Sequence, residues 1–112
     1  MPAAYTNLYL EAGSDFSASV LIDDVYQEIY DLTGYTAYSQ LRKSYYSANA
    51  AATFSTSIDI TSGVITMQLD AANTATIKPG RYVYDTIITD DVHQSTVRIL
   101  EGVIDVSPRV TR

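Results

Sequence analysis

Apolar residues at every second position define several short segments of this chain. This period of two occurs over residues 16–22, 35–43, 53–60 and 64–69. Successive side chains of a β-strand point to opposite faces, so the alternation predicts half-buried strands. On the first two segments the expected core side consists of Phe16, Ala18, Val20 and Ile22, and of Tyr35, Ala37, Ser39 and Leu41. On the later two it consists of Phe54, Thr56, Ile58 and Ile60, and of Ile65, Met67 and Leu69.

The clearest pair of segments lies near the C-terminus. Pro79-Gly80 is a turn pair, and a run rich in tyrosine, valine, isoleucine and threonine follows it over residues 81–89. A polar break over 90–94 separates this run from a second one over 95–106. Two such runs joined by about five polar residues predict a β-hairpin with a longer loop.

The remaining segments are less regular. Residues 5–10 predict a short first strand. Residues 25–31 show helix-like spacing, but the segment is short and contains two tyrosines, so we expect a connection with a short strand. Residues 44–52 are small and polar apart from two tyrosines, and we expect an exposed loop. Before the last hairpin, Asp70 or Asn73 is suited to cap one short helical turn.

These elements amount to about seven to eight short strands, with turn signals about every 8 to 12 residues. That arrangement is typical of an antiparallel sandwich or a small barrel. The chain is the size of one domain, and we assign residues 1–112 to a single one.

A detail of the last hairpin favours the sandwich. A strand, a short crossover and then Gly80-Arg81-Tyr82-Val83-Tyr84 are similar to the tyrosine corner of immunoglobulin-like sandwiches. On that analogy Tyr82 anchors the crossover through its hydroxyl, Tyr84 and Ile88 lie in the core, and Asp85 lies on the opposite face. The predicted fold is therefore all-β, an immunoglobulin-like antiparallel β-sandwich of about seven to eight strands.

The composition of the chain argues against several classes of function. Thirteen acidic and seven basic residues give a formal net charge of −6, which disfavours nucleic acid as a partner. The absence of cysteine excludes disulfides and thiolate sites, and a single histidine excludes a His-rich metal site. No apolar run approaches the roughly 20 residues of a membrane helix, and the start lacks the pattern of a signal peptide. We expect no cofactor, no membrane partner and no export by a signal of the chain's own.

Several acidic residues are candidates for a catalytic or metal site. Asp23-Asp24 and Asp90-Asp91 fall in predicted turns, where aspartate is favoured for its own backbone hydrogen bonding. Calcium would need a further oxygen ligand from a neighbouring loop, and no loop shows ligands at alternate positions. His93 lies beside the second pair, in a loop tip with no nucleophile context. We interpret all five as solvated loop residues, with no catalytic or metal site.

Two carboxylates lie in apolar strands, where a charge is less expected. Asp85 and Glu101 belong to the two strands of the last hairpin, and pairing around its tip places Asp85 roughly opposite residue 99. Asp85 and Arg98 then form a cross-strand ion pair. Alternatively these charged groups mark a subunit contact face, and the sequence leaves both interpretations open.

Tyrosine accounts for ten of the twelve aromatic residues, and tryptophan is absent. Its ring can be buried at a contact while its hydroxyl stays hydrated, which makes it frequent at protein interfaces. Sugar-binding surfaces also use aromatic rings, although the lack of tryptophan weighs against them here. The candidate interaction surface consists of Tyr26, Tyr30, Tyr38, Tyr45 and Tyr46.

Four segments together resemble a known family. They lie over residues 16–22, 31–44 (DLTGYTAYSQLRKS), 62–87 (SGVITMQLDAANTATIKPGRYVYDTI) and 98–111 (RILEGVIDVSPRVT). The likeness covers roughly residues 14–111 and is to small virion proteins of tailed bacteriophages. In particular the chain is similar to the immunoglobulin-like N-terminal domain of the phage baseplate upper protein family.

The resemblance implies a non-catalytic piece of a phage particle, assembled in the host cytoplasm and working in the virion. Its partners would be other virion proteins, and it would act as a homo-oligomer or docked on those partners. It transfers no active-site residues. The expected function is thus that of a structural and interaction protein of the tail, the baseplate or the neck and head region. The alternative is a carbohydrate-binding or adhesion module that uses the exposed tyrosines and the acidic loops.

Overall fold

A computed structural model describes residues 4–22, 32, 34–90 and 94–108. The bounds of its elements are β1 Ala4–Tyr5, β2 Leu8–Glu11, β3 Phe16–Leu21, β4 Tyr35–Arg42, β5 Ala52–Thr53, β6 Ser55–Asp59, β7 Val64–Leu69, α2 Ala71–Thr74, β8 Gly80–Asp90 and β9 Ser95–Ser107. The predicted all-β fold is confirmed. The described residues form nine strands, of which β1 and β5 have only two residues each.

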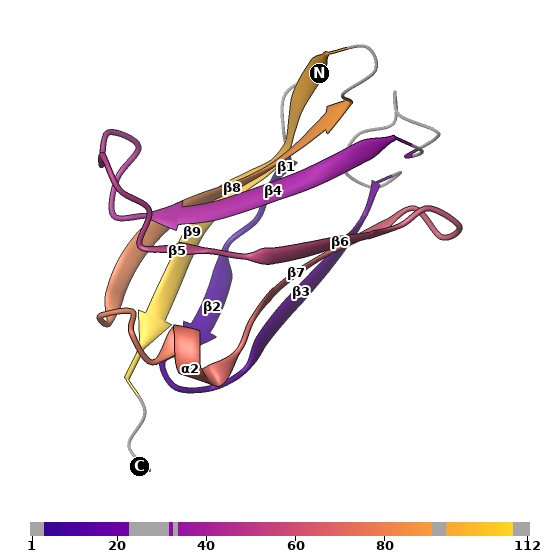
Figure 1. Ribbon diagram of the computed structural model, residues 1–112. Helices are drawn as coiled ribbons and strands as arrows, with labels where there is room; N and C mark the ends of the chain where they lie inside the picture. Colours follow the sequence, from indigo (N-terminus) through magenta and orange to yellow (C-terminus); the bar gives the residue numbers. More distant parts are fainter. Residues whose placement is uncertain (1–3, 23–31, 33, 91–93, 109–112) are drawn as a thin grey trace.

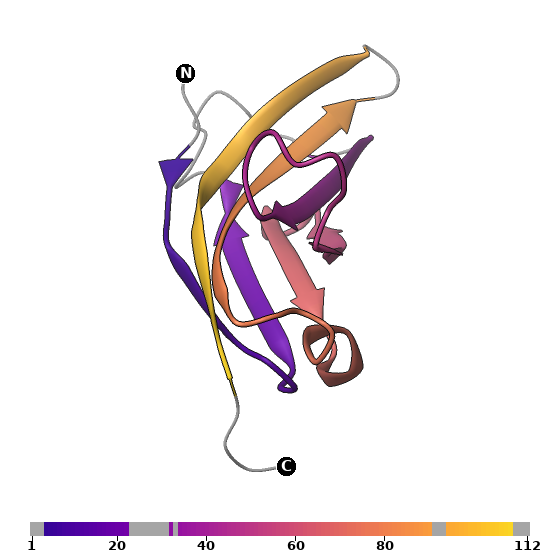
Figure 2. The ribbon, with the colours of Figure 1, turned by 90° about the vertical axis from the view of Figure 1, so that its left-hand side faces the viewer.

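The strands form two sheets that pack as the layers of a sandwich (Figures 1 and 2). The larger sheet has the order β1-β9-β8-β4-β5, with β2 also paired to β9, and the smaller sheet has the order β3-β7-β6. In the nomenclature of immunoglobulin domains, β4, β8 and β9 match strands C, F and G, while β3, β7 and β6 match B, E and D.

The first two strands do not follow the antiparallel pattern. Both β1 and β2 run parallel to β9, with Ala4 beside Leu100 and Leu8 beside Ile104. A turn at Gly13 then leads the chain from β2 into β3 of the other sheet. The N-terminal segment therefore lies on the edge of the larger sheet, which makes that sheet mixed.

The β8–β9 hairpin is the longest element and confirms the predicted one. Its register shifts between Thr86 and Ile87, and on the other strand Ile99 and Leu100 are both buried in succession. Two neighbouring residues on one side of a strand are typical of a β-bulge, which adds a residue to one strand of a pair. As a result Asp85 lies opposite Glu101, and the predicted position opposite residue 99 is wrong.

Both sheets contribute to one buried core. It contains the predicted core residues Ala37, Leu41, Phe54, Ile65, Met67, Leu69, Tyr84 and Ile88. Full burial of one such aliphatic side chain contributes about 1.5–3 kcal/mol to stability. One expectation is wrong, because Ile60 is 54% exposed. Strand β6 ends at Asp59, whose carboxylate accepts hydrogen bonds from the backbone N–H groups of Thr61 and Ser62 and so begins the turn early.

The predicted helical turn before the last hairpin is confirmed as α2, which lies across one end of the two sheets (Figure 1). Asp70 caps it, and its Oδ1 accepts from the backbone N–H of Asn73 at 2.9 Å. The buried Thr74 hydroxyl donates to the Ser14 carbonyl at 2.7 Å, which ties α2 to the turn between β2 and β3. No helix among the described residues is both long enough and apolar enough to span a membrane.

Tyr82 forms the hydrogen bond that defines a tyrosine corner. Its hydroxyl donates to the Lys78 carbonyl at 2.7 Å, at the point where the chain leaves α2 and enters β8. The Lys43 ammonium lies 4.9 Å from the centre of the Tyr82 ring, which adds a cation–π contact from the end of β4. The hydrogen bond and the cation–π contact together hold the Tyr82 ring in place where the chain crosses between the sheets.

Candidate interaction surface

The outer face of the larger sheet is the surface with the most features of a contact site. Side chains of β8 alternate between the core and this face, with Tyr84 and Thr86 buried and Val83 and Asp85 outward. The strand register places outward side chains of β4, β8, β9, β1 and β2 side by side across it. Its apolar and aromatic residues are Tyr5, Tyr9, Tyr38, Val83, Ile87 and Val103.

Charges on this outer face nearly balance one another. It holds the three cations Arg42, Arg81 and Arg98 and the four carboxylates Glu11, Asp85, Glu101 and Asp105. Of the thirteen acidic and seven basic residues in the chain, nine acidic and four basic ones lie elsewhere, so −5 of the formal net charge of −6 belongs to the rest of the molecule. The outer face is therefore close to neutral on an acidic protein.

Two of the arginines are paired within the sheet. Arg81 contacts Asp105 at 3.0 Å across the β8–β9 ladder, and Arg98 contacts Glu101 at 2.9 Å within β9. The predicted ion pair between Asp85 and Arg98 is therefore wrong. The bulge of the hairpin places Glu101 opposite Asp85, and the guanidinium of Arg98 binds Glu101 instead.

Asp85 is half-buried in the middle of this face. Burial raises the pKa of its carboxyl, the nearby guanidiniums of Arg98 and Arg42 lower it, and Glu101 raises it, with a net shift upward. Within the described part of the chain, Asp85 forms no ion pair within 4.0 Å. Asp85 is thus a half-buried carboxylate that no ion pair with a described residue compensates.

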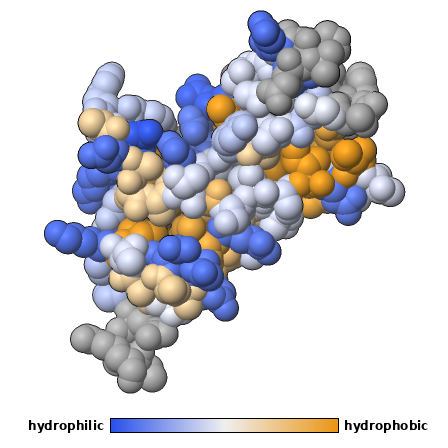
Figure 3. Space-filling model, viewed as in Figure 1, coloured by the Kyte–Doolittle hydropathy of each residue, from blue (hydrophilic) through white to orange (hydrophobic). Residues whose placement is uncertain are grey.

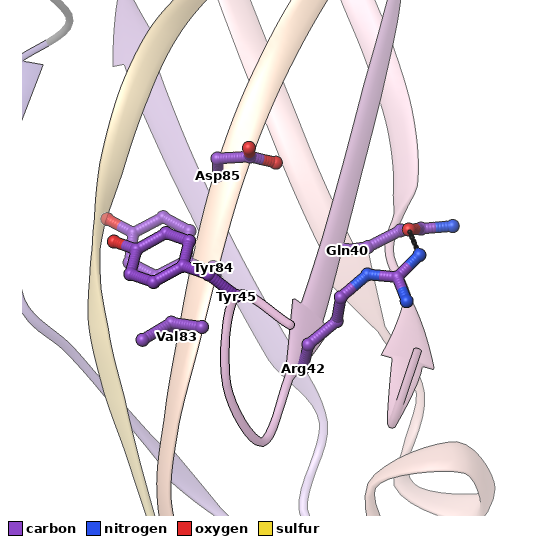
Figure 4. Close-up of a pocket in the computed structure, with 6 residues that line it drawn as sticks. All are labelled: Gln40, Arg42, Tyr45, Val83, Tyr84 and Asp85. Atoms are coloured by element: carbon purple, nitrogen blue, oxygen red, sulfur yellow. Dashed lines mark hydrogen bonds between the residues drawn. The ribbon is translucent and has the colours of Figure 1, made fainter. Parts of the chain in front are cut away.

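A small hollow lies next to Asp85 (Figure 4). Its volume is about 130 Å³, and its lining residues are Gln40, Arg42, Tyr45, Val83, Tyr84 and Asp85. The guanidinium of Arg42 donates to Gln40 Oε1 and to the carbonyl of Ser47, both at 2.9 Å. Arg42 is thus held in place by two neutral oxygens, and its positive charge has no carboxylate partner among the described residues.

The structure brings together only part of the tyrosine surface predicted from sequence. Tyr38 is 53% exposed on β4, and Tyr45 is 58% exposed in the loop that follows β4, beside the hollow. Tyr46, in the same loop, is 97% exposed. Tyr26 and Tyr30 lie outside the described residues.

Two exposed tyrosines were missed by the sequence analysis. Tyr5 and Tyr9 are 60% and 74% exposed, at the β1 and β2 edge of the same face. The sequence pattern that could have identified Tyr9 is its position between Leu8 and Leu10. These two residues point inward, so the tyrosine between them points outward. The face therefore has exposed tyrosines at both of its lateral edges.

The acidic loop residues add no metal site in the part of the chain that the structure describes. Asp23, Asp24, Asp91 and His93 lie outside that part, and Asp90 is buried at the end of β8. The described residues contain no group of three or more His, Cys, Asp or Glu side chains that could hold a metal ion.

A second apolar area lies where β4 begins and β6 ends (Figure 3). It is a shallow groove of about 260 Å³, and the exposed Ile60 lies at one end of it. Its other apolar residues include Tyr35, Ala37 and Ile58. The groove lacks charged residues, so it has fewer specific contacts to offer than the outer face of the larger sheet.

Comparison with known proteins supports the fold. No protein-family model matches the chain, and a search of curated proteins finds no match. The crystal structure of InlP from Listeria monocytogenes is similar to 94% of this chain, with a TM-score of 0.54 and 9% sequence identity. The chain spans only 28% of the InlP chain. At this identity the likeness shows a shared β-sandwich, immunoglobulin-like fold and nothing of function.

Proposed function

We propose that this chain is a non-catalytic structural and interaction protein of a tailed phage particle, located in its tail, its baseplate or its neck and head region. It assembles with other virion proteins in the host cytoplasm and docks on them through the outer face of the larger sheet. The likeness of residues 14–111 to the baseplate upper protein family supports the setting. The immunoglobulin-like sandwich is the fold that this likeness implies.

The observation that carries the proposal is the composition of that outer face. Tyrosine and arginine are enriched at protein interfaces, and a contact site combines an apolar centre with a polar rim. Here Val83 lies opposite Val103 at the centre, Arg81 and Arg98 lie farther along the strands, and exposed tyrosines lie at the lateral edges. The face rests on the long β8–β9 hairpin, which is a rigid support for a docking surface.

Analysis of purified particles tests this function. Quantitative mass spectrometry of gradient-purified virions, from the phage that encodes the chain, should find it at a fixed copy number per particle. A Val83→Arg substitution on the outer face should exclude the chain from particles. The matched Ser57→Arg substitution, on the exposed side of the smaller sheet, should leave incorporation unchanged. A chain abundant in infected cells but absent from virions contradicts the proposal.

A second candidate function is carbohydrate binding, and the hollow beside Asp85 favours it. Its lining includes the aromatic ring of Tyr45, the carboxylate of Asp85, the amide of Gln40 and the guanidinium of Arg42 (Figure 4). These groups can stack on a sugar ring and hydrogen-bond its hydroxyls. A glycan array with the wild-type chain and Tyr45→Ala distinguishes this function, because only the sugar-binding account expects binding that the substitution abolishes.

A further inference from the structure

We propose that the outer face of the larger sheet binds a second copy of this chain, in a two-fold dimer where Asp85 of each protomer pairs with Arg42 of the other. This inference rests on the proposed function and names the first partner of the same face. Three features of the described residues support it: the charge balance of the face, two opposite charges on it that form no ion pair, and its size.

The charge balance decides where two copies can approach. Each chain has a formal net charge of −6, so two copies repel one another at most orientations. The outer face is the exception, because its three arginines nearly offset its four carboxylates. Contact through this face reduces the repulsion at close range, and salt screens the remainder beyond about 10 Å at 0.1 M ionic strength.

Two of the charges without an ion pair are opposite in sign. Among the described residues neither Asp85 nor Arg42 forms an ion pair within 4.0 Å, and the two lie on adjacent strands. Asp85 is opposite Gln40 and Arg42 is opposite Val83, so the two residues are diagonal neighbours. Consider a two-fold axis that lies in the plane of the interface, midway between the two residues and perpendicular to the line that joins them. This axis places each Asp85 over Arg42 of the other protomer. A two-fold contact of this kind is reciprocal, so the ion pair forms twice.

The size and apolar centre of the face suit a dimer. The face consists of β4, β8, β9 and the edge segment over residues 4–11. With strands about 4.8 Å apart and residues about 3.3 Å apart, four strands of eight residues have a flat area of roughly 500 Å². A stable interface buries about 800 Å² of accessible surface on each partner, and side chains add to the flat area of a sheet. Val83, Val103 and Ile87 supply the apolar centre, and the hollow beside Asp85 has room for a partner's side chain.

The test uses charge reversal and mixing. In Asp85→Arg, both reciprocal contacts bring two arginines together, and in Arg42→Glu, both bring two carboxylates together. Each variant alone should dimerise at least about tenfold more weakly than the wild type, because like charges at an interface are costly. An equimolar mixture of the two variants restores opposite charges at both contacts and should form a heterodimer. Light scattering and analytical ultracentrifugation over a range of concentrations measure all three samples.

The control is Ser57→Arg, which adds an arginine on the exposed side of the smaller sheet and should leave the dimer unchanged. Recovery on mixing also shows that both variants are folded, since a misfolded chain cannot restore a specific contact. A wild-type monomer at all concentrations, a dimer insensitive to both reversals, or a mixture that stays monomeric would each overturn the inference. A monomer leaves the proposed function standing, because particle composition tests that function without reference to self-association.

Discussion

The hydroxyl of Tyr84 donates a hydrogen bond of 2.5 Å to the carbonyl of Thr6, a residue 78 positions earlier in the chain. Thr6 lies between β1 and β2, where the N-terminal segment runs along the edge of the larger sheet. The bond therefore joins the centre of the sheet to its outermost segment. It also holds the segment that exposes Tyr5 and Tyr9 at the edge of the outer face of the larger sheet.

Removing this hydroxyl should destabilise the fold. Tyr84→Phe keeps the buried ring and loses one hydrogen bond, so we expect the free energy of unfolding to fall by about 1 kcal/mol. Urea denaturation measures it, with Tyr46→Phe as the control, because Tyr46 is almost fully exposed. Equal stability of the two variants would contradict the structural role of the bond.

Alkaline pH should lower the stability of the fold through ionisation of Tyr84. Burial, with a smaller effect of Tyr5, raises the pKa of Tyr84 to about 12 from its ordinary 10.0. The folded state therefore holds this proton more tightly than the unfolded state. Its contribution to stability is complete below pH 10 and is lost as the pH rises from 10 to 12. Thermal melts over this range should show a steeper loss in the wild type than in Tyr84→Phe.

Gly102 makes room for the N-terminal segment. A Cβ atom added there would lie 2.0 Å from the Thr6 carbonyl oxygen, so Gly102→Ala must displace the backbone near β1. Forced overpacking of this kind costs about 1–3 kcal/mol. Hydrogen exchange should show faster exchange over residues 4–11 in this variant. Unchanged exchange there, relative to a Ser57→Ala control, would argue against the close approach.

Ionisation of Asp85 should lower the stability of the fold, whereas ionisation of a carboxylate in an ion pair raises it. Its pKa is raised in the folded state, mainly by burial, so the folded protein binds this proton more tightly than the unfolded chain. Ionised Asp85 thus lowers stability above the unfolded-state pKa of 3.8. In dilute, monomeric protein, Asp85→Asn should be more stable at pH 7, by less than about 1 kcal/mol given its partial exposure. The difference should vanish near pH 3, and a variant less stable at pH 7 would refute this account.

Exposed tyrosines should affect association and leave folding unchanged. Tyr38→Ser on the outer face should raise the dissociation constant of the proposed dimer about tenfold, as expected for a tyrosine at a contact. Tyr46→Ser, in the loop after β4, should weaken association less. Light scattering measures both effects, and melting curves serve as the control. A melting temperature displaced by many degrees would show that the tyrosine belongs to the core.

The sequence predicted the sandwich because alternation and turn signals act locally. Period-two patterns identified β3, β4, β7 and the last hairpin, and the Gly-x-Tyr pattern identified the corner at Tyr82. The parallel pairing of β1 and β2 was not predicted, because it depends on which sheet edge the N-terminal segment joins. That choice is made by contacts distant in the chain, such as the bond from Tyr84 to Thr6.

The candidate interaction surface was only partly predictable for the same reason. Tyr38 and Tyr45 were identified from composition, but the near balance of charges on the outer face arises from strand register. A single bulge near Ile99 moved Glu101 opposite Asp85 and gave Arg98 a partner within its own strand. Periodicity alone does not reveal a bulge, since both of its residues are apolar.

The most direct test of the proposed function is a cryo-electron microscopy map of the phage particle in which we propose that this chain is a component. We predict that the map contains the domain and that another protein chain covers the outer face of the larger sheet, centred on Val83 and Asp85. A map in which this face is bare toward solvent, with the domain held by other surfaces, would contradict it.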